Sequence, residues 1–425
     1  MKVKIILCRP AVLILLLFFI TCSKDNTPVL SVNETFYNFT KIVHSGDLII
    51  SNSGEGELSW EITDKPNWLE TSKSSGIVTN DNDTVVVIAD VNQELGTYSG
   101  TINIESNGGN QIVEVSLIID IWVEATPMPT ARFWASSEVV NGKIYVIGGA
   151  AIDGAPALAT VEEYDPLSNT WKSKQNMPTP RCIIASAMVD GKIYIFGGDR
   201  NFQSHVTNGV RTLEVYDPTN DIWDTTKTPM PTARSSASAS AVNDIIYVIG
   251  GATPGGAASN EVEAYNPVTD TWETKSPMPT ARWALSTEVV DGKIYAMGSG
   301  QRGINTRVEE YDPATDTWTQ KAYMLVSNGY FGTGVIDGII YAVGGSWSAG
   351  SYYSRVDAYD PSTDEWSAKT PMPTARFALC AGVFNEKIYA IGGGRSQVGH
   401  LPQFQLLKNM ILLLIQNSVD YYRLE

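Results

Sequence analysis

Between residues 28 and 119, short runs of alternating apolar and polar positions follow one another closely. The runs have the length and β-branched composition of strands, and they lie at 47–51, 57–62, 84–88, 99–104 and 112–117. Clusters of Asn, Ser and Gly at 52–56 and 107–110 predict turns between strands. A stretch of this length and pattern predicts a small immunoglobulin-like β-sandwich at 28–120.

From residue 121 a longer pattern recurs every 46 to 53 residues. Each unit opens with Pro-Met-Pro-Thr-Ala-Arg or a variant of it, followed by an apolar strand, a turn, and an Ile-Tyr strand that ends in Gly-Gly or Gly-Ser-Gly. In the first five units a third strand ends in Tyr-Asp-Pro or Tyr-Asn-Pro, and a fourth opens with Trp. The repeated Arg falls at Arg132, Arg181, Arg234, Arg282 and Arg376, with Asn328 in the fifth unit, and the Trp at Trp171, Trp223, Trp272, Trp318 and Trp366.

A period of about fifty residues with four strands per unit is typical of kelch repeats, and the Gly-Gly, Tyr and Trp positions resemble that family. The resemblance implies a β-propeller whose blades bury one another's faces. Because Ile121-Trp122 is similar to Thr271-Trp272, Trp122 is expected to begin the outer strand of the last blade. The expected fold class is all-β, with a six-bladed kelch β-propeller at 121–425 preceded by the small sandwich.

The small domain also carries a family resemblance. Leu58-Ser-Trp60, Pro66-Asn-Trp68-Leu and Gly96-Thr-Tyr-Ser-Gly occur in the order found in BACON-type domains. That family lies at the N-termini of gut-bacterial surface proteins, many of them linked to carbohydrate use. The resemblance implies a spacer with affinity for glycans or mucin. Within it, Trp60 and Trp68 are expected to belong to the core.

The amino terminus has the three-part layout of an export signal. Lys2 and Lys4 precede an apolar run at 11–20, which is shorter than the roughly 20 residues of a membrane span. Residues 19–22 resemble a bacterial lipobox, although Thr21 stands where that family usually has Gly, Ala or Ser. We expect a signal peptide at 1–21, a tether at 22–27 and lipidation of Cys22. The anchor would hold the protein at the bacterial outer membrane, on its periplasmic or cell-surface side; plain secretion is the alternative.

The sixth unit follows the repeat through Gly393 and then departs from it. No Tyr-Asp-Pro follows, and the apolar run at 406–416 does not resemble a propeller strand. Codons for 408–416 read two bases further on permit Glu-Tyr-Asp-Pro. We therefore interpret 396–425 as an abnormal tail that a frameshift produces within the third strand. A genuine but divergent terminus is the alternative, and the gene sequence decides between them.

Composition excludes several classes of function. The net charge of −16 opposes binding to nucleic acid, which requires a basic face. The four cysteines do not form a disulfide framework, and Cys182 and Cys380 are expected to be buried. Three histidines cannot supply a copper site of the galactose oxidase kind, and no Cys/His zinc spacing, nucleophile elbow or phosphate loop occurs. No cofactor or metal is expected.

Candidate binding residues follow from the blade order. Loops between strands four and one share a face with loops between strands two and three, because strands alternate in direction. In kelch propellers the residue after the repeated Arg often faces the central opening. The candidate ligand-binding residues are Phe133, Trp134, Asp199, Arg200, Trp283, Gln301, Arg302, Trp347, Phe377 and Arg395. Aromatic faces with Arg and carboxylate groups suit a sugar, including an acidic one. Alternatively, the aromatics fill the opening as packing, and the repeated Arg bonds carbonyls of neighbouring blades rather than forming an anion-binding ring.

These features favour a binding module over an enzyme. We expect a surface lipoprotein that binds a glycan or a protein partner through the loop face of its propeller. The alternative is a sugar mutarotase or epimerase similar to the six-bladed kelch-type enzymes that act on sialic acid. Mutarotation needs little more than an acid and a base near the anomeric carbon, so it leaves a weak mark in the sequence.

The lipidation of Cys22 gives a direct prediction. Replacing Cys22 with Ser removes the thiol that would carry the lipid, so the protein should move from the membrane fraction to the soluble fraction of the producing cells. Metabolic labelling with a fatty acid, followed by fractionation, measures both effects. A Cys8→Ser variant is the matched control and should keep its label. Labelling of the Cys22→Ser variant at the level of the unaltered protein would contradict lipidation.

Overall fold

The structure is a computed structural model that describes residues 27–40, 45–79, 81–91, 93, 96–119, 122–151, 156–200, 208–301, 303–348, 351–396, 404–406 and 410–414. These residues form strands and connecting turns in two compact units, which meet between Ile121 and Trp122 along the chain. Within them there is no helix long and apolar enough to cross a membrane. The expected signal peptide and Cys22 lie outside the described residues.

The first unit is a sandwich of two sheets, which correspond to the strands that the alternating pattern predicts. One sheet has the order β1 (Leu30–Val32), β3 (Ser45–Asn52), β7 (Asp83–Ala89) and β5 (Leu69–Thr71). The other has the order β2 (Phe36–Thr40), β9 (Gln111–Ile119), β8 (Gly96–Ser106), β4 (Leu58–Asp64) and β6 (Ser75–Val78). The β2–β9 pair is parallel.

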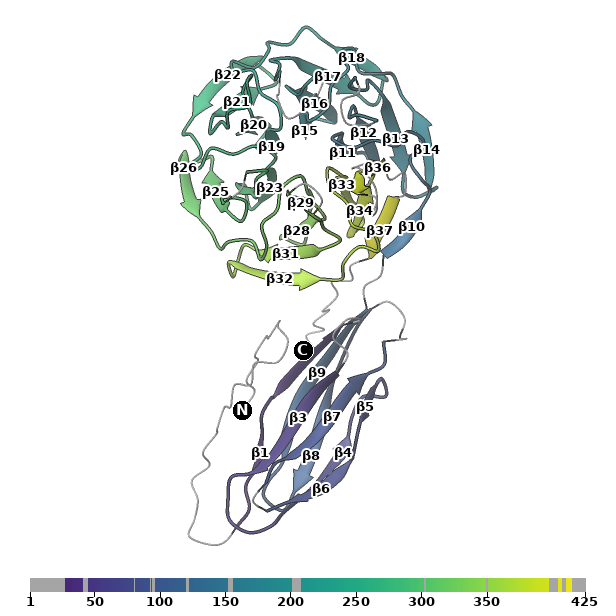
Figure 1. Ribbon diagram of the computed structural model, residues 1–425, viewed down its shortest axis with the longest axis vertical. Helices are drawn as coiled ribbons and strands as arrows, with labels where there is room; N and C mark the ends of the chain where they lie inside the picture. Colours follow the sequence, from purple (N-terminus) through teal and green to yellow (C-terminus); the bar gives the residue numbers. More distant parts are fainter. Residues whose placement is uncertain are drawn as a thin grey trace, which may run out of the picture. The chain divides into compact units, whose positions relative to one another are not determined.

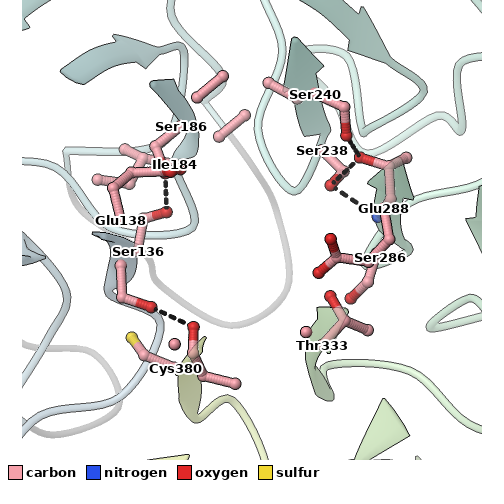
Figure 2. A pocket seen from close by; sticks show the side chains of 18 of the residues that line it. Ser136, Glu138, Ile184, Ser186, Ser238, Ser240, Ser286, Glu288, Thr333 and Cys380 are labelled. Carbon is pink, nitrogen blue, oxygen red and sulfur yellow. Dashed lines mark hydrogen bonds between the residues drawn. The ribbon is translucent and has the colours of Figure 1, made fainter. Parts of the chain in front are cut away.

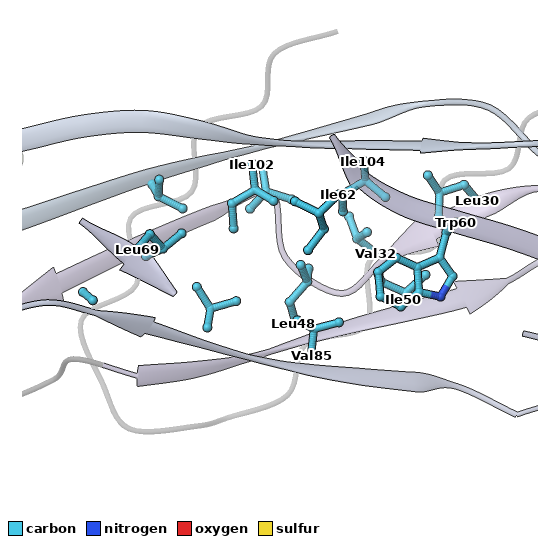
Figure 3. Close-up of a cluster of buried hydrophobic side chains, with 14 of the residues drawn as sticks. Leu30, Val32, Leu48, Ile50, Trp60, Ile62, Leu69, Val85, Ile102 and Ile104 are labelled. Carbon is cyan, nitrogen blue, oxygen red and sulfur yellow. The ribbon is translucent and has the colours of Figure 1, made fainter. Parts of the chain in front are cut away.

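The core of the sandwich lies between these sheets (Figure 3). Along β4 the side chains of Leu58, Trp60 and Ile62 are buried, whereas those of Ser59 and Glu61 are exposed. This period of two is what one buried face of a strand requires. Trp60 is 2% exposed and Trp68 is 5% exposed. Both tryptophans therefore contribute to packing and do not present their faces to a ligand.

The second unit is a propeller of six four-stranded sheets arranged around one centre (Figure 1). The first three sheets contain, from the centre outward, β11 (Ser136–Val140), β12 (Lys143–Ile147), β13 (Val161–Asp165) and β14 (Thr170–Ser173); β15 (Ala185–Val189), β16 (Lys192–Phe196), β17 (Leu213–Asp217) and β18 (Ile222–Asp224); and β19 (Ser238–Val242), β20 (Ile245–Ile249), β21 (Val262–Asn266) and β22 (Thr271–Lys275).

The remaining three sheets contain β23 (Ser286–Val290), β24 (Lys293–Met297), β25 (Val308–Asp312) and β26 (Thr317–Gln320); β27 (Gly332–Ile336), β28 (Ile339–Val343), β31 (Val356–Asp360) and β32 (Glu365–Lys369); and β33 (Cys380–Phe384), β34 (Lys387–Ile391), β37 (Met410–Leu414) and β10 (Trp122–Ala125). Two small ribbons pair β29 (Ser346–Ser348) with β30 (Ser351–Tyr352) and β35 (Gly394–Ser396) with β36 (Phe404–Leu406). Every pairing within the propeller sheets is antiparallel.

The sixth sheet joins the two ends of the propeller segment. Strand β10 is its outer strand and pairs with β37, with Trp122 opposite Leu413. The Trp122 indole N–H donates to the Thr370 carbonyl over 3.1 Å, just as the Trp366 indole donates to Ala322 over 3.3 Å. Trp122 thus makes the same contact to the preceding blade as the other outer-strand tryptophans do.

The third strand of the sixth sheet corrects one expectation. The run at 406–416 was expected to suit no propeller strand, but Met410–Leu414 pairs with β34 on one edge and β10 on the other. An apolar run is compatible with a strand that is flanked on both edges. By register, Ile411 opposite Ala390 takes the place that Glu162 takes opposite Val146 in the first sheet. The frameshift therefore stays a prediction about the gene.

A closed ring of backbone hydrogen bonds joins the inner ends of the blades. Each amide in the ring donates to the carbonyl of the blade before it, over 2.8 to 3.2 Å, and the last bond runs from Trp134 to Ala378. The six residues of this ring, called the axial ring below, are Trp134, Ile183, Ser236, Ala284, Tyr330 and Ala378. All six have φ between 46° and 56°, a left-handed conformation that is uncommon for residues other than glycine.

The repeated Arg side chains are buried inside their own blades. The Arg181 guanidinium donates to Glu214 over 2.6 Å and to the carbonyls of Gly197 and Thr212 over 2.7 and 3.2 Å. Its own backbone carbonyl accepts from Gly149 of the preceding blade over 3.0 Å. Since the Arg side chains are at most 1% exposed, they do not form an anion-binding ring. Each Arg side chain donates to carbonyls of its own blade, whereas its backbone carbonyl accepts a hydrogen bond from the preceding blade.

The fifth blade departs from this arrangement. Asn328 takes the place of the Arg and donates its side-chain amide to the Gly344 carbonyl over 2.8 Å. The carboxylate of that blade, Asp357, accepts instead from Arg355 at 2.6 Å. The charge pair is therefore kept in the fifth blade, but its cation approaches from a partly exposed position.

The buried pairs predict a large and asymmetric effect on stability. Replacing Arg181 with Met leaves Glu214 charged and buried, so the free energy of unfolding should fall by about 3–5 kcal/mol. Adding Glu214→Leu removes the orphaned charge and should restore part of that loss. Urea unfolding measures both variants. The control is Lys143→Met, which breaks the partly exposed pair with Asp165 and should cost about 1 kcal/mol or less. Equal losses for Arg181→Met and Lys143→Met would contradict a structural role for the buried pair.

Candidate functional site

The aromatic residues that the sequence places at the central opening pack against one another. Phe133 and Trp134 lie with ring centroids 4.1 Å apart, and Phe133 lies 5.9 Å from Phe377. These three side chains are 1%, 8% and 7% exposed. Tyr352 stacks on Phe377 at 4.6 Å. These four residues, called the aromatic cluster, fill space at the loop face. They agree with the alternative in which the aromatic residues serve as packing and do not bind a ligand.

The structure describes the other predicted site residues unevenly. Asp199 is fully buried and accepts the amide of Asn208 over 2.8 Å, whereas Arg200 is exposed. Trp283 is partly buried and lies 5.9 Å from Tyr330, while Gln301 is partly buried in the loop that follows β24. Arg302 lies outside the described residues, and only the backbone of Trp347 and Arg395 is described. The predicted loop-face site stays a prediction.

Beside the axial ring, a cavity of about 560 Å³ runs along the propeller axis (Figure 2). Its walls are the inner strands of all six blades, β11, β15, β19, β23, β27 and β33, and residues of the axial ring close around one end. Each inner strand has a partner on one edge only. The other edge therefore turns backbone N–H and C=O groups toward the cavity, where they are available to hydrogen-bond a guest.

Side-chain hydroxyls add to this polar wall and join neighbouring blades. Ser186 lies 2.5 Å from both Ser136 and Glu138 of the first blade. Ser240 lies 2.7 Å from Thr287 in the fourth blade. The positions of these hydroxyls are thereby fixed by contacts between blades. A rigid wall of this kind does not have to reorganise when a ligand binds.

Two carboxylates, Glu138 and Glu288, project from opposite sides of the cavity in Figure 2. Burial raises the pKa of Glu138 to about 7, against a hydrogen bond from Ser186, and the charge of Glu288 raises it further. Burial likewise raises the pKa of Glu288 to about 7, against a hydrogen bond from Thr333. A pair of carboxyl groups that titrate near neutral pH can serve as acid and base, or bind a cation.

Sequence reasoning missed both glutamates. They occupy the third position of their inner strands, where the other blades have Ala187, Ser240, Gly334 and Gly382. A charged residue at a position that is small elsewhere in the repeat was the available signal. Among the described residues, no group of three or more His, Cys, Asp or Glu side chains is placed to hold a metal ion.

Six four-stranded blades define a kelch β-propeller; four of them contain a buried Arg–carboxylate pair, and five have Gly-Gly after the second strand. The chain belongs to the kelch-repeat family: the model of the KLHDC2/KLHL20/DRC7 Kelch-repeats domain matches residues 45–251, 88–300 and 185–393. The first two matches begin within the sandwich, whereas the third lies entirely within the propeller.

Two known proteins illustrate the similarity. Kelch-like protein 35 of Mus musculus is 28% identical over 156 residues, which are 36% of this chain and 25% of that protein. The chain thus matches a quarter of that relative's length. The solved structure of YjhT superposes with a TM-score of 0.59 at 15% identity, covering 69% of this chain and 98% of YjhT. At this identity the likeness to YjhT supports the fold alone.

The raised pKa values predict how stability depends on pH. Glu138 and Glu288 hold a proton more tightly in the folded state than their ordinary pKa of 4.5 allows. Their contribution to stability is therefore complete below pH 4.5 and is lost as the pH rises to about 7. Because one pKa unit is worth about 1.4 kcal/mol, each residue should lower the free energy of unfolding by up to about 3 kcal/mol across this range.

Urea unfolding at several pH values measures this loss, and carbon NMR of the glutamate carboxyls gives the two pKa values directly. The double variant Glu138→Gln and Glu288→Gln should show a flatter profile and greater stability at pH 8. A profile that is equally steep in the double variant would assign the pH dependence to other groups.

Proposed function

We propose that this protein is an exported, lipid-anchored binding protein whose propeller holds a hydroxyl-rich ligand of the sugar class in its central cavity. The observation that carries the proposal is the cavity itself, a rigid space of about 560 Å³ walled by strand edges, hydroxyls and two carboxylates. Ligand pockets are commonly about 300–1,000 Å³ and fix their ligand with a few placed polar groups. Export and anchoring rest on the sequence at 1–22.

The chemistry of the wall matches that of a sugar. Each hydroxyl of a sugar both donates and accepts a hydrogen bond, and the inner strand edges offer both kinds of partner. Carboxylates are strong acceptors for hydroxyl donors. At one end of the cavity, Trp134 and Tyr330 belong to the lining, and aromatic side chains suit the C–H faces of a sugar ring.

A protein partner at the loop face is the alternative ligand, because a kelch propeller can mediate protein binding. In that arrangement the partner would contact exposed loop residues such as Arg200, and the cavity would stay free. The BACON-type resemblance adds support for a carbohydrate ligand, since that family is linked to carbohydrate use. With its tryptophans buried, we propose that the sandwich acts as a spacer.

A second function, sugar mutarotation or epimerisation, is favoured by one observation. Glu138 and Glu288 line the same cavity, and each has a pKa of about 7. One carboxylate can remove the proton of the anomeric hydroxyl while the other, as its acid, protonates the ring oxygen. The kelch-type enzymes that this alternative resembles act on sialic acid-like sugars, and such a substrate would lie beside two carboxylates in this cavity.

One set of samples tests both functions. Ligand-observed NMR of the full chain with neutral hexoses should show saturable binding. Ser286 lines the cavity and donates its hydroxyl to the Phe331 carbonyl over 3.0 Å, which leaves its oxygen as an acceptor for a sugar hydroxyl. Ser286→Ala should therefore weaken binding about three- to tenfold through loss of one hydrogen bond. The control Arg200→Ala, at an exposed loop position, should leave binding unchanged. If Arg200→Ala weakened sugar binding and Ser286→Ala did not, the ligand would bind at the loop face and not in the cavity. Anomer exchange measured on the same samples, including sialic acid, should equal that in buffer for a pure binding protein.

A further inference from the structure

We infer that the central cavity selects a cationic ligand, a sugar-sized polyol that carries an ammonium group, over its neutral and anionic counterparts. The inference rests on the proposed function and names the chemical class that the same cavity takes. It is carried by the positions of two carboxylates in the cavity and by a described lining that contains no Lys, Arg or His.

The carboxylates stand on opposed walls of the cavity. Glu138 belongs to the first blade and Glu288 to the fourth, which are three blades apart in a ring of six. Figure 2 shows them on either side of the open space. The described residues that line the cavity include these two carboxylates and no Lys, Arg or His side chain. A guest in the cavity therefore lies within a field of one sign.

Each carboxylate has capacity to bind more than its present partner. Glu138 accepts from Ser186, and Glu288 accepts from Thr333. An ionised carboxylate offers about four lone-pair sites, so one hydroxyl leaves most of them for a guest. An ammonium group has three hydrogen-bond donors and a positive charge. That charge stabilises the ionised form of both carboxylates, which burial otherwise disfavours.

Two aromatic residues belong to the lining at one end of the cavity. Trp134 and Tyr330, both members of the axial ring, belong to the lining. The faces of indole and phenol rings attract ammonium groups, by about 0.5–2 kcal/mol according to their exposure to water. A ring that reaches the cavity would add to the attraction of the two carboxylates for an organic cation.

The turns at the far end of the inner strands carry further negative charge. In five of the six blades the turn after the inner strand contains an acidic residue, namely Asp190, Asp244, Asp291, Asp337 and Glu386. Three of these turns are followed by a lysine, namely Lys192, Lys293 and Lys387, so they offset part of this charge; Lys293 is engaged with Glu310 at 3.0 Å. Carboxylates around a cavity focus the field and raise the local concentration of cations.

The same charges oppose an acidic sugar. A sugar acid would bring a third negative charge between Glu138 and Glu288, and like charges in a poorly hydrated space repel strongly. The repeated arginines cannot compensate, because their guanidinium groups are buried inside the blades. The structure thus points away from the acidic sugar that the sequence allowed.

Binding of a cation should be linked to pH. Glu138, Glu288, Tyr330 and Cys380 are the titratable groups among the described lining residues. Burial raises the pKa of Tyr330 and holds that of Cys380 at about 12, so neither ionises between pH 6 and 8. Only the two glutamates change charge in this window, and they become negative as the pH rises through about 7. The affinity for a cation should rise with them.

Calorimetry with three sugars of one ring size tests the selection. At pH 7 glucosamine should bind about tenfold or more tightly than glucose, and glucuronate should bind most weakly. Glu138→Gln and Glu288→Gln should each lower the glucosamine-to-glucose affinity ratio, and the double variant should abolish it. Glu365→Gln removes one exposed carboxylate outside the cavity and is the control, with an unchanged ratio. Thermal unfolding of each variant verifies that it is folded.

A permanently charged derivative, N-trimethylated glucosamine, isolates the pH effect from titration of the ligand. Its affinity should rise from pH 6 to pH 8 in the unaltered protein and stay level in the double variant. If none of the sugars binds, the proposed function fails and the inference fails with it. If sugars bind but glucuronate equals or exceeds glucosamine, or the ratio survives in the double variant, the proposed function stands and the cationic selection is overturned.

Discussion

The axial ring is the interaction on which the rest of the propeller depends. Six amides donate to six carbonyls in one direction around the axis, and the ring closes between Ala378 and Trp134. Each member adopts a left-handed conformation that costs energy for residues other than glycine. Ile183 is β-branched, which makes this conformation especially unfavourable for it. The ring persists because the blades on either side leave these residues no other position.

The ring explains why the cavity has a fixed shape. It holds the starts of the six inner strands together, and in the first four blades a buried Arg–carboxylate pair then holds the Arg to the third strand of its own blade. The backbone beside the axial ring is closely packed, since a Cβ at Gly149 would lie 2.8 Å from the Phe133 carbonyl oxygen. Hydroxyls and carboxylates on the inner strands therefore keep their positions whether or not a ligand is present.

Sequence reasoning located the scaffold far better than the site. The periodic Arg, Gly-Gly, Tyr and Trp positions predict the blades because each fills the same place in every unit. The aromatics at Phe133 and Phe377 were chosen for facing the opening, but their packing partners, such as Tyr352, come from another loop. Glu138 and Glu288 were missed because their chemistry depends on a space enclosed by all six blades, which no single repeat reveals.

The sequence alone determined the period, the four strands of the first five blades and the strand at Trp122, because these follow from local alternation, turn residues and repetition. It also determined that the sandwich precedes the propeller. Only the tertiary structure decided which of the polar residues share a cavity, which arginines are buried, and which aromatics are packing. Those properties depend on the distances between residues of different blades and on the loss of water around them, and no single segment of the sequence determines either quantity.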